Sequence, residues 1–142
     1  MSTVLFTGRF DKPHVGHIIN IQRLGQKFEN VIVCVLDDGK QFYPIKERIQ
    51  ILFDALENSK GNYTVISNKT NFEQISSLRI KAEVPNFDVY ASGNWNCVQN
   101  LKNMGYKTID VARYPGYTAR TGRVIQKIIS IIEKEFDTDI KQ

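Results

Sequence analysis

The sequence predicts an α/β protein with a five-stranded parallel sheet and helices on both faces. Short apolar runs alternate with longer segments in which apolar residues recur every three or four positions, as they do on one face of a helix. One run, Val-Ile-Val-Cys-Val-Leu at residues 31–36, shows no alternation, as expected of a strand covered on both faces. The 142 residues contain no linker, repeat or charge block, so we expect a single domain over residues 1–142.

The first half of the chain contains three expected strands, at residues 4–6, 31–36 and 63–66. A helix is expected after each strand, at residues 18–28, 45–56 and 72–80, because the apolar residues there share one helical face. In the first helix these are Ile18, Ile21, Leu24 and Phe28, and in the second they are Ile45, Ile49, Leu52, Phe53 and Leu56.

The second half continues the alternation. A strand at residues 87–91 precedes a helix at 98–104, for which Gly105 is a plausible stop. A strand at 108–112 precedes the most regular helix, at 124–136. Five such alternations favour parallel strands joined by helical crossovers.

The composition excludes several classes of protein. With 42% hydrophobic and 24% charged residues, the chain is neither disordered nor of low complexity. It has no apolar run of the ~20 residues that span a membrane and no visible export signal, so we expect a cytoplasmic location and no membrane partner. Cys34 and Cys97 are too far apart for a metal or redox motif. The 19 basic against 15 acidic residues suit an anionic ligand and are too few to predict nucleic-acid binding.

Unusual polar residues follow the expected strands, in the segments 7–17, 37–43, 67–70, 92–96 and 113–123. Ligands of parallel α/β sheets bind outside the carboxyl ends of the strands, so these segments are the candidate site. In the first of them, His14 and His17 lie on one side of a helix start, where backbone N–H groups point the same way. Gly16 leaves room for a ligand to approach the backbone.

Two imidazoles at a helix N-terminus predict a phosphate site. Each histidine alone could be structural, His14 as a helix cap and His17 packed on the sheet, but together they favour function. The chain has no Gly-x-Gly-x-x-Gly, no Walker lysine and no nucleophile elbow, which disfavours dinucleotide dehydrogenases, P-loop enzymes and hydrolases. A phosphate site without a protein nucleophile indicates that the substrates react with each other.

The pattern Gly8-x-Phe10-Asp11-x-x-His14-x-Gly16-His17 resembles the signature of the HxGH nucleotidyltransferases, the cytidylyltransferase-like superfamily. Four further matches follow in order: Pro-Ile-Lys-Glu-Arg at 44–48, Asn-Phe-Glu at 71–73, Phe-Asp-Val-Tyr-Ala-Ser-Gly-Asn-Trp at 87–95 and Arg-Tyr-Pro-Gly-Tyr-Thr at 113–118. Within the superfamily, the small bacterial glycerol-3-phosphate cytidylyltransferases are the most similar in our interpretation. The opening Gly8-Arg9-Phe10 is more typical of archaeal-type nicotinamide mononucleotide adenylyltransferases.

The resemblance implies a Rossmann-like domain in which an acceptor phosphate attacks the α-phosphate of a nucleoside triphosphate and pyrophosphate leaves. It implies that His14 and His17 hold the α- and β-phosphates, that Thr118 holds the β- and γ-phosphates and that Arg113 adds charge. The implied nucleotide-binding residues are Thr7, Gly8, Arg9, Phe10, Gly16, Ser92, Gly93, Asn94, Trp95, Arg120 and Arg123. The implied acceptor-binding residues are Asp37, Lys40 and Arg48, and Asp11 is the candidate ligand of a magnesium ion.

The choice of substrates stays open at this point. We expect CTP and a phosphorylated alcohol or sugar, because Trp95 and the Arg113-x-x-Gly116 pattern favour a cytidylyltransferase. The alternatives are an adenylyltransferase that uses ATP, with nicotinamide mononucleotide or another phosphorylated acceptor, and a nucleotide-binding module without catalysis. The second signature departs from the family at Arg120 and Gly122, which replace a hydroxyl residue and an isoleucine. The small cytidylyltransferases are dimers, so a homodimer is expected.

Overall fold

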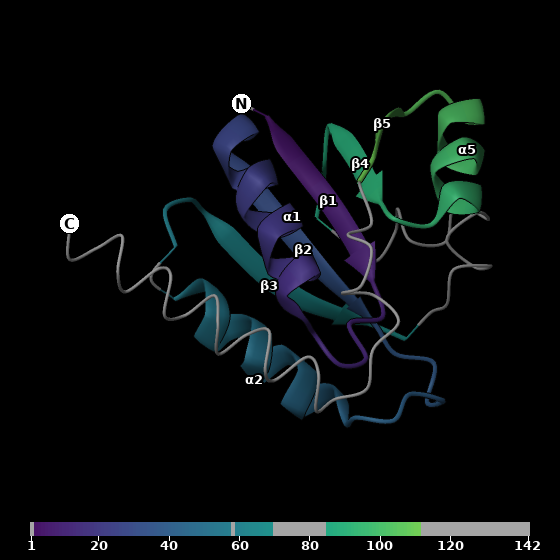
Figure 1. The fold of residues 1–142 in the computed structure, drawn as a ribbon. Coiled ribbons are helices and arrows are strands. Elements are labelled where there is room, and N and C mark those ends of the chain that lie inside the picture. Colours follow the sequence, from purple (N-terminus) through teal and green to yellow (C-terminus); the bar gives the residue numbers. More distant parts are fainter. Residues whose placement is uncertain (1, 58, 70–84, 112–142) are drawn as a thin grey trace.

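The computed structural model describes residues 2–57, 59–69 and 85–111. Its strands are β1 (Thr3–Gly8), β2 (Asn30–Leu36), β3 (Tyr63–Asn68), β4 (Val89–Ser92) and β5 (Lys107–Asp110). They pair in parallel, in the order β3-β2-β1-β4-β5 (Figure 1). The described helices are α1 (Val15–Lys27), α2 (Ile45–Leu56) and α5 (Trp95–Asn103). The predicted α/β fold with five parallel strands is confirmed; the helices expected at 72–80 and 124–136 lie outside the described residues.

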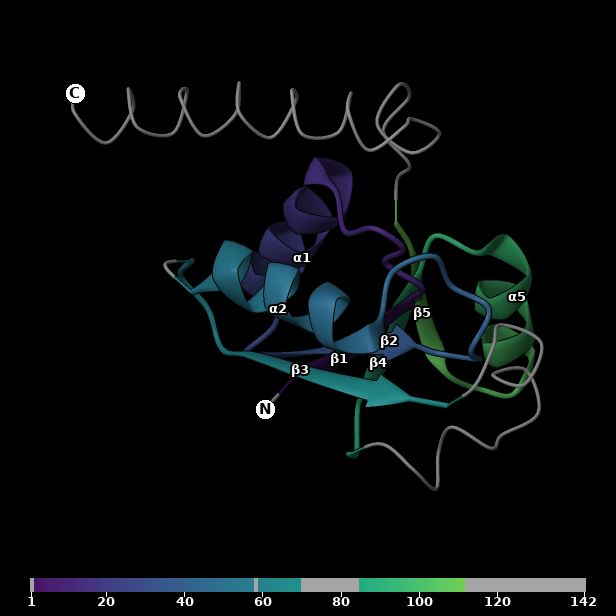
Figure 2. The same cartoon turned by 90° about the horizontal axis from the view of Figure 1, so that it is seen from below.

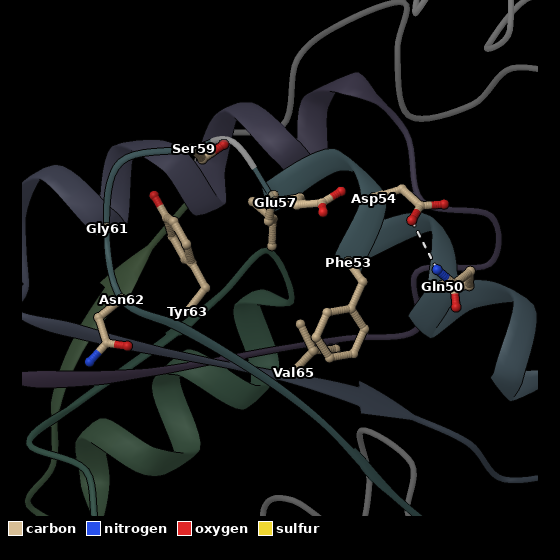
Figure 3. Close-up of a pocket in the computed structure, with 10 residues that line it drawn as sticks. Gln50, Phe53, Asp54, Glu57, Ser59, Gly61, Asn62, Tyr63 and Val65 are labelled. Carbon is tan, nitrogen blue, oxygen red and sulfur yellow. Dashed lines mark hydrogen bonds between the residues drawn. The ribbon is translucent and has the colours of Figure 1, made fainter.

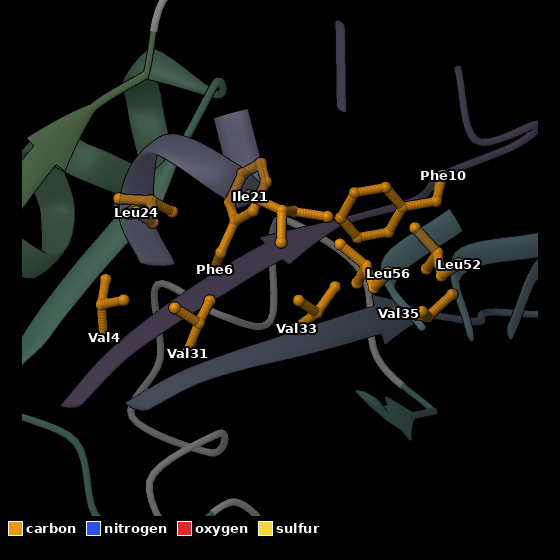
Figure 4. Packing of buried hydrophobic residues seen from close by; sticks show 11 residues of the cluster. Val4, Phe6, Phe10, Ile21, Leu24, Val31, Val33, Val35, Leu52 and Leu56 are labelled. Atoms are coloured by element: carbon orange, nitrogen blue, oxygen red, sulfur yellow. The ribbon is translucent and has the colours of Figure 1, made fainter. Parts of the chain in front are cut away.

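The central strands bury both of their faces, as the unbroken apolar run at 31–36 predicts. On one face, alternate residues of β1 and β2 pack with Phe10 and with apolar residues of α1 and α2 (Figure 4). Figure 2 shows α1 and α2 side by side on this face. The intervening residues of β1 and β2 point to the other face, where they pack with Tyr90 and with apolar residues of α5. They are Leu5, Ile32, Cys34 and Leu36. Each large apolar side chain buried in this way contributes roughly 1.5–3 kcal/mol.

Two helices begin earlier than the apolar periodicity indicates. Helix α1 begins at Val15 instead of Ile18, and α5 begins at Trp95 instead of Val98. In both, a polar residue caps the first turn: the side chain of His14 accepts from the backbone of His17, and that of Asn94 accepts from Cys97. Apolar periodicity marks the buried face of a helix, so it misses a first turn that faces the carboxyl edge of the sheet.

The order of the strands places a topological switch point between β1 and β4. The chain adds β2 and β3 on one side of β1 and then crosses to add β4 and β5 on its other side. At such a point the connections leave on opposite faces of the sheet and open a crevice at the carboxyl ends of the two strands. The segment 9–14 follows β1 and the segment 93–94 follows β4, so both border this crevice. Within the described ranges, no helix is long and apolar enough to cross a membrane.

Candidate anion site at the carboxyl edge of the sheet

The two histidines of the chain form a reciprocal capping box at the start of helix α1. The backbone N–H of His14 donates to Nδ1 of His17 over 3.1 Å, and the backbone N–H of His17 donates to Nδ1 of His14 over 3.3 Å. Their rings are stacked, with centroids 3.6 Å apart and planes 19° from parallel. Because each Nδ1 accepts a hydrogen bond, the proton of each neutral imidazole lies on Nε2. Both rings are therefore Nε2–H donors at the N-terminus of a helix.

His14 is the more buried of the two and has only 7% of its surface exposed. This burial lowers the pKa of His14 from 6.5 to about 4, because desolvation disfavours the charged ring. His14 is therefore neutral at pH 7 and keeps the Nε2–H tautomer. The backbone N–H groups of the first turn add the positive end of the helix dipole, which favours an anion at this position.

The Phe10 ring packs against the His17 ring, and Gly8 leaves the space that the Phe10 ring occupies. The Phe10 ring is 1% exposed and meets the His17 ring edge-on, with centroids 4.8 Å apart and planes at 73°. A Cβ on Gly8 would lie 2.9 Å from Cζ of Phe10, so no larger residue fits at this position without displacing the ring. Gly16 is buried in the first turn of α1, and its expected role of leaving room for a ligand stays a prediction.

The structure gives Asp11 a role other than metal binding. One carboxylate oxygen accepts the backbone N–H of Phe42 over 2.9 Å, and the other accepts that of Tyr43 over 3.0 Å. Both oxygens thus hold the loop after β2, and the expected role of Asp11 as a magnesium ligand stays a prediction. The described part of the chain contains no group of three or more His, Cys, Asp or Glu side chains placed to hold a metal ion.

Arg48 also differs from the expectation that it contacts a substrate. Its side chain is fully buried and forms an ion pair of 3.1 Å with Asp37. Its other donors reach three backbone carbonyl oxygens, those of Arg9, Leu36 and Tyr43. Arg48 and Asp37 therefore hold loops together, and of the three predicted acceptor-binding residues only Lys40 is an exposed residue that could meet an anion directly.

The predicted nucleotide-binding residues after β4 shape the start of α5. Ser92 is fully buried and accepts the backbone N–H of Asn94 over 3.0 Å, while Asn94 caps the helix through Cys97. Trp95 is 63% exposed at the first position of the helix, so it is not a core residue. Its indole is available to a flat ligand at the carboxyl edge, next to Gly93.

Thr7 lies at the end of β1 in a buried hydrogen bond that the sequence analysis did not foresee. Its Oγ1 is 2.6 Å from the hydroxyl of Tyr90, a residue of β4 that is also fully buried. The sequence signal for this hydrogen bond is the hydroxyl residue Thr7 after the apolar run at residues 4–6. The Thr7–Tyr90 hydrogen bond thus links β1 to β4 beside the switch point. Arg9, two residues further along the chain, is exposed.

Four predicted residues of the second signature, Arg113, Thr118, Arg120 and Arg123, lie outside the described residues, as does the 71–73 motif. A separate open hollow of about 470 Å³ lies between the end of α2 and the start of β3 (Figure 3). It is lined by residues such as Phe53, Glu57 and Tyr63 and contains none of the predicted site residues.

A parallel sheet with a histidine pair at the first helix start, beside the switch point, is the arrangement that the HxGH resemblance predicts. Comparison with known families agrees with this geometry. The chain belongs to the cytidylyltransferase-like family, whose model matches residues 5–124.

The curated relatives point to one branch of this family. The chain is 31% identical over 114 residues to a nicotinamide-nucleotide adenylyltransferase of Thermococcus sibiricus, covering 74% of this chain and 61% of the relative. Enzymes of the same name from Thermococcus onnurineus and Pyrococcus furiosus are 30% and 28% identical, covering 74% and 77% of this chain and 60% and 63% of each relative. The chain thus spans about three fifths of the length of these relatives.

These relatives overturn the expected preference for CTP. Trp95 and Arg113-x-x-Gly116 favour a cytidylyltransferase and Gly8-Arg9-Phe10 an adenylyltransferase, and the names of these relatives agree with the second pattern. These relatives do not show the particular similarity to glycerol-3-phosphate cytidylyltransferase that the sequence motifs indicated. The homodimer was expected from that similarity alone, so it remains an untested prediction.

Proposed function

We propose that this chain is an adenylyltransferase that joins the AMP moiety of ATP to a nicotinamide nucleotide and releases pyrophosphate. The observation that carries the proposal is the pair of Nε2–H donors at the start of α1, in a chain whose similar proteins are named nicotinamide-nucleotide adenylyltransferases. An acceptor of this kind brings its own phosphate nucleophile, which suits a site that has no protein nucleophile.

In the proposed reaction, a phosphate oxygen of the acceptor forms a bond to the α-phosphorus of ATP. The bond from that phosphorus to the oxygen bridging to the β-phosphate breaks, and its electron pair leaves with pyrophosphate. The nucleophile is already an anion, so no proton has to be removed. Catalysis then depends on positioning and on stabilising the charge of the crowded transition state.

His14 and His17 would donate their Nε2–H groups to oxygens of the α- and β-phosphates. A neutral donor suits this task because it binds the charge that develops without a strong ion pair in the ground state. The exposed cations Arg9 and Lys40, on the loops after β1 and β2, would attract the two anionic substrates. Trp95 would contact a flat ring of one of them. Magnesium enters the proposal only as a counter-ion of the triphosphate, without a ligand among the described residues.

A pyrophosphate-release assay tests this function. ATP and CTP are each combined with nicotinamide mononucleotide, with glycerol 3-phosphate and with no acceptor. The proposal predicts release only with ATP and the nicotinamide nucleotide, and loss of that release in His17→Ala. A matched control, Gln26→Ala on the exposed side of α1, should keep the activity. Binding of ATP without release under any condition would instead indicate a non-catalytic nucleotide-binding module.

A further inference from the structure

We propose that Arg48 is a positioning residue that orients the two histidines through the backbone of Arg9 and the ring of Phe10. The kinetic part of this inference rests on the proposed function, whereas its structural part does not.

The contacts of Arg48 converge on the loop that follows β1. Nη1 of the buried guanidinium donates to the carbonyl oxygen of Arg9 over 2.7 Å, the shortest of its contacts, and to that of Leu36 over 3.0 Å. Nε donates to the carbonyl oxygen of Tyr43 over 2.9 Å, and Nη2 reaches Asp37. A buried guanidinium is costly to desolvate, and here its forked donors are directed at backbone rather than toward a ligand.

The carbonyl that Arg48 holds lies directly before an unusual backbone conformation. Phe10 has a φ of 47°, in the left-handed region that a bulky residue rarely adopts. Such a conformation costs of order 1–3 kcal/mol and persists only where the surroundings determine it fully. For Phe10, these surroundings are the Arg48 bond on its N-terminal side and the burial of its own ring against Phe6, with centroids 5.6 Å apart.

A second connection holds the C-terminal side of Phe10. Asp11 accepts the backbone N–H groups of Phe42 and Tyr43, and Nζ of Lys12 lies 5.4 Å from the centre of the Tyr43 ring. The loop after β1 is therefore held on both sides of Phe10, by Arg48 of α2 before it and by the loop after β2 behind it. With both flanks held, the Phe10 ring has one position, and it is the position that meets His17.

The order of contacts then runs from Arg48 to the Arg9 carbonyl, to the Phe10 ring, to His17 and finally to the stacked His14. Without Arg48, the peptide at Arg9 loses its donor and Phe10 can relax to an ordinary negative φ. Its ring would then leave the edge of His17, and the stacked, mutually capping arrangement would loosen. Arg48 itself would touch no substrate at any stage.

The test substitutes Arg48→Met, which keeps a long side chain in the buried position but removes every donor. Nitrogen-edited NMR of the side chains follows the two histidines directly, since the chain has no others. We expect loss of the Nε2–H tautomer pattern and a rise in the pKa of His14 from about 4 toward 6.5. We also expect a fall in kcat of about a hundredfold, the cost of a small misplacement of catalytic groups, with a much smaller change in the KM for ATP.

Two further variants keep the test decisive. Phe10→Leu leaves Arg48 in place but removes the ring, and it should give the same histidine spectrum, so it decides the matter if Arg48→Met does not fold. Val31→Ala is a matched destabilising control, because Val31 belongs to the same core but lies at the amino end of β2, and it should leave the spectrum and kcat unchanged.

A folded Arg48→Met with the wild-type histidine spectrum would overturn the inference, and so would a Val31→Ala variant with the same spectral change. If wild-type protein shows no adenylyl transfer but the spectrum of Arg48→Met changes as expected, the proposed function fails and the positioning role stands. The two failures are therefore distinguishable.

Discussion

His14 and His17 each accept the backbone N–H of the other through Nδ1, so the same two contacts begin helix α1 and determine where the side-chain protons lie. In most capping boxes, the two capping side chains serve only the helix. Here the atoms used for capping are the Nδ1 atoms, on one side of each ring, and the proposed ligand contacts would use Nε2–H on the other side. Structure and function of this helix start are thus coupled, and a substitution at either position affects both.

The first prediction separates these two roles at His17. His17→Ala should lose at least about a hundredfold in turnover, as expected for the loss of a donor to the transition state. His17→Gln restores an acceptor at the third helical position, which suits a capping box, so it should recover helix stability but not turnover. Steady-state kinetics and circular dichroism measure both quantities. Near-normal turnover in a folded His17→Ala would remove His17 from the site.

The second prediction concerns the dependence of stability on pH. The pKa of His14 falls from 6.5 to about 4 on folding, so between these values the unfolded chain binds more protons than the folded one. This contribution to stability is complete at pH 7 and is lost as the pH falls toward 4, by up to roughly 3 kcal/mol.

His14→Asn is the matched comparison for this measurement, because asparagine is a good N-cap and does not titrate. Urea unfolding of both proteins at a series of pH values should show a difference in stability that shrinks as the pH is lowered through this window. Parallel curves for the two proteins would mean that His14 titrates normally in the folded state.

The third prediction is steric and concerns Gly8. Gly8→Ala places a Cβ 2.9 Å from Cζ of Phe10, whose ring is enclosed by Phe6 and His17 and cannot move away cheaply. We expect a loss of stability of about 1–3 kcal/mol, typical of overpacking, together with reduced turnover. In a Phe10→Leu background, the same substitution should cost much less, and this non-additivity is the signature of the contact. Additive losses in the double variant would show that the clash lies elsewhere.

The fold was predictable because its longest unbroken apolar run is also its most buried strand. The run at 31–36 has no polar position, and a strand of that kind needs cover on both faces, which implies the crossovers that make the sheet parallel. The starts of α1 and α5 were less predictable from apolar periodicity, since each first turn has a single buried apolar side chain, Val15 in α1 and Cys97 in α5. The polar caps are the better signal, which was used for His14 but not for Asn94.

The sequence predicts which segments lie at the carboxyl edge of the sheet, but it does not show the contacts that their side chains make there. Asp11 and Arg48 bear charges that suit a metal ion and a phosphate, and a sequence does not show that backbone groups of a neighbouring loop already occupy them. The left-handed conformation of Phe10 has no sequence signal either, because it is imposed by contacts from residues about 40 positions away. The prediction of CTP was wrong because it relied on Trp95, an exposed residue, and gave less importance to Gly8-Arg9-Phe10, which precede the histidine pair.

In the proposed reaction, the α-phosphate of ATP is transferred to a nicotinamide nucleotide. The most direct measurement uses ATP labelled at the α-phosphorus in one reaction and at the γ-phosphorus in another, each with nicotinamide mononucleotide and the protein. Adenylyl transfer predicts that the α-label enters a dinucleotide product and that the γ-label appears only in pyrophosphate. Label from the γ-phosphorus in the nucleotide product, or α-label that remains in ATP or AMP, would contradict it.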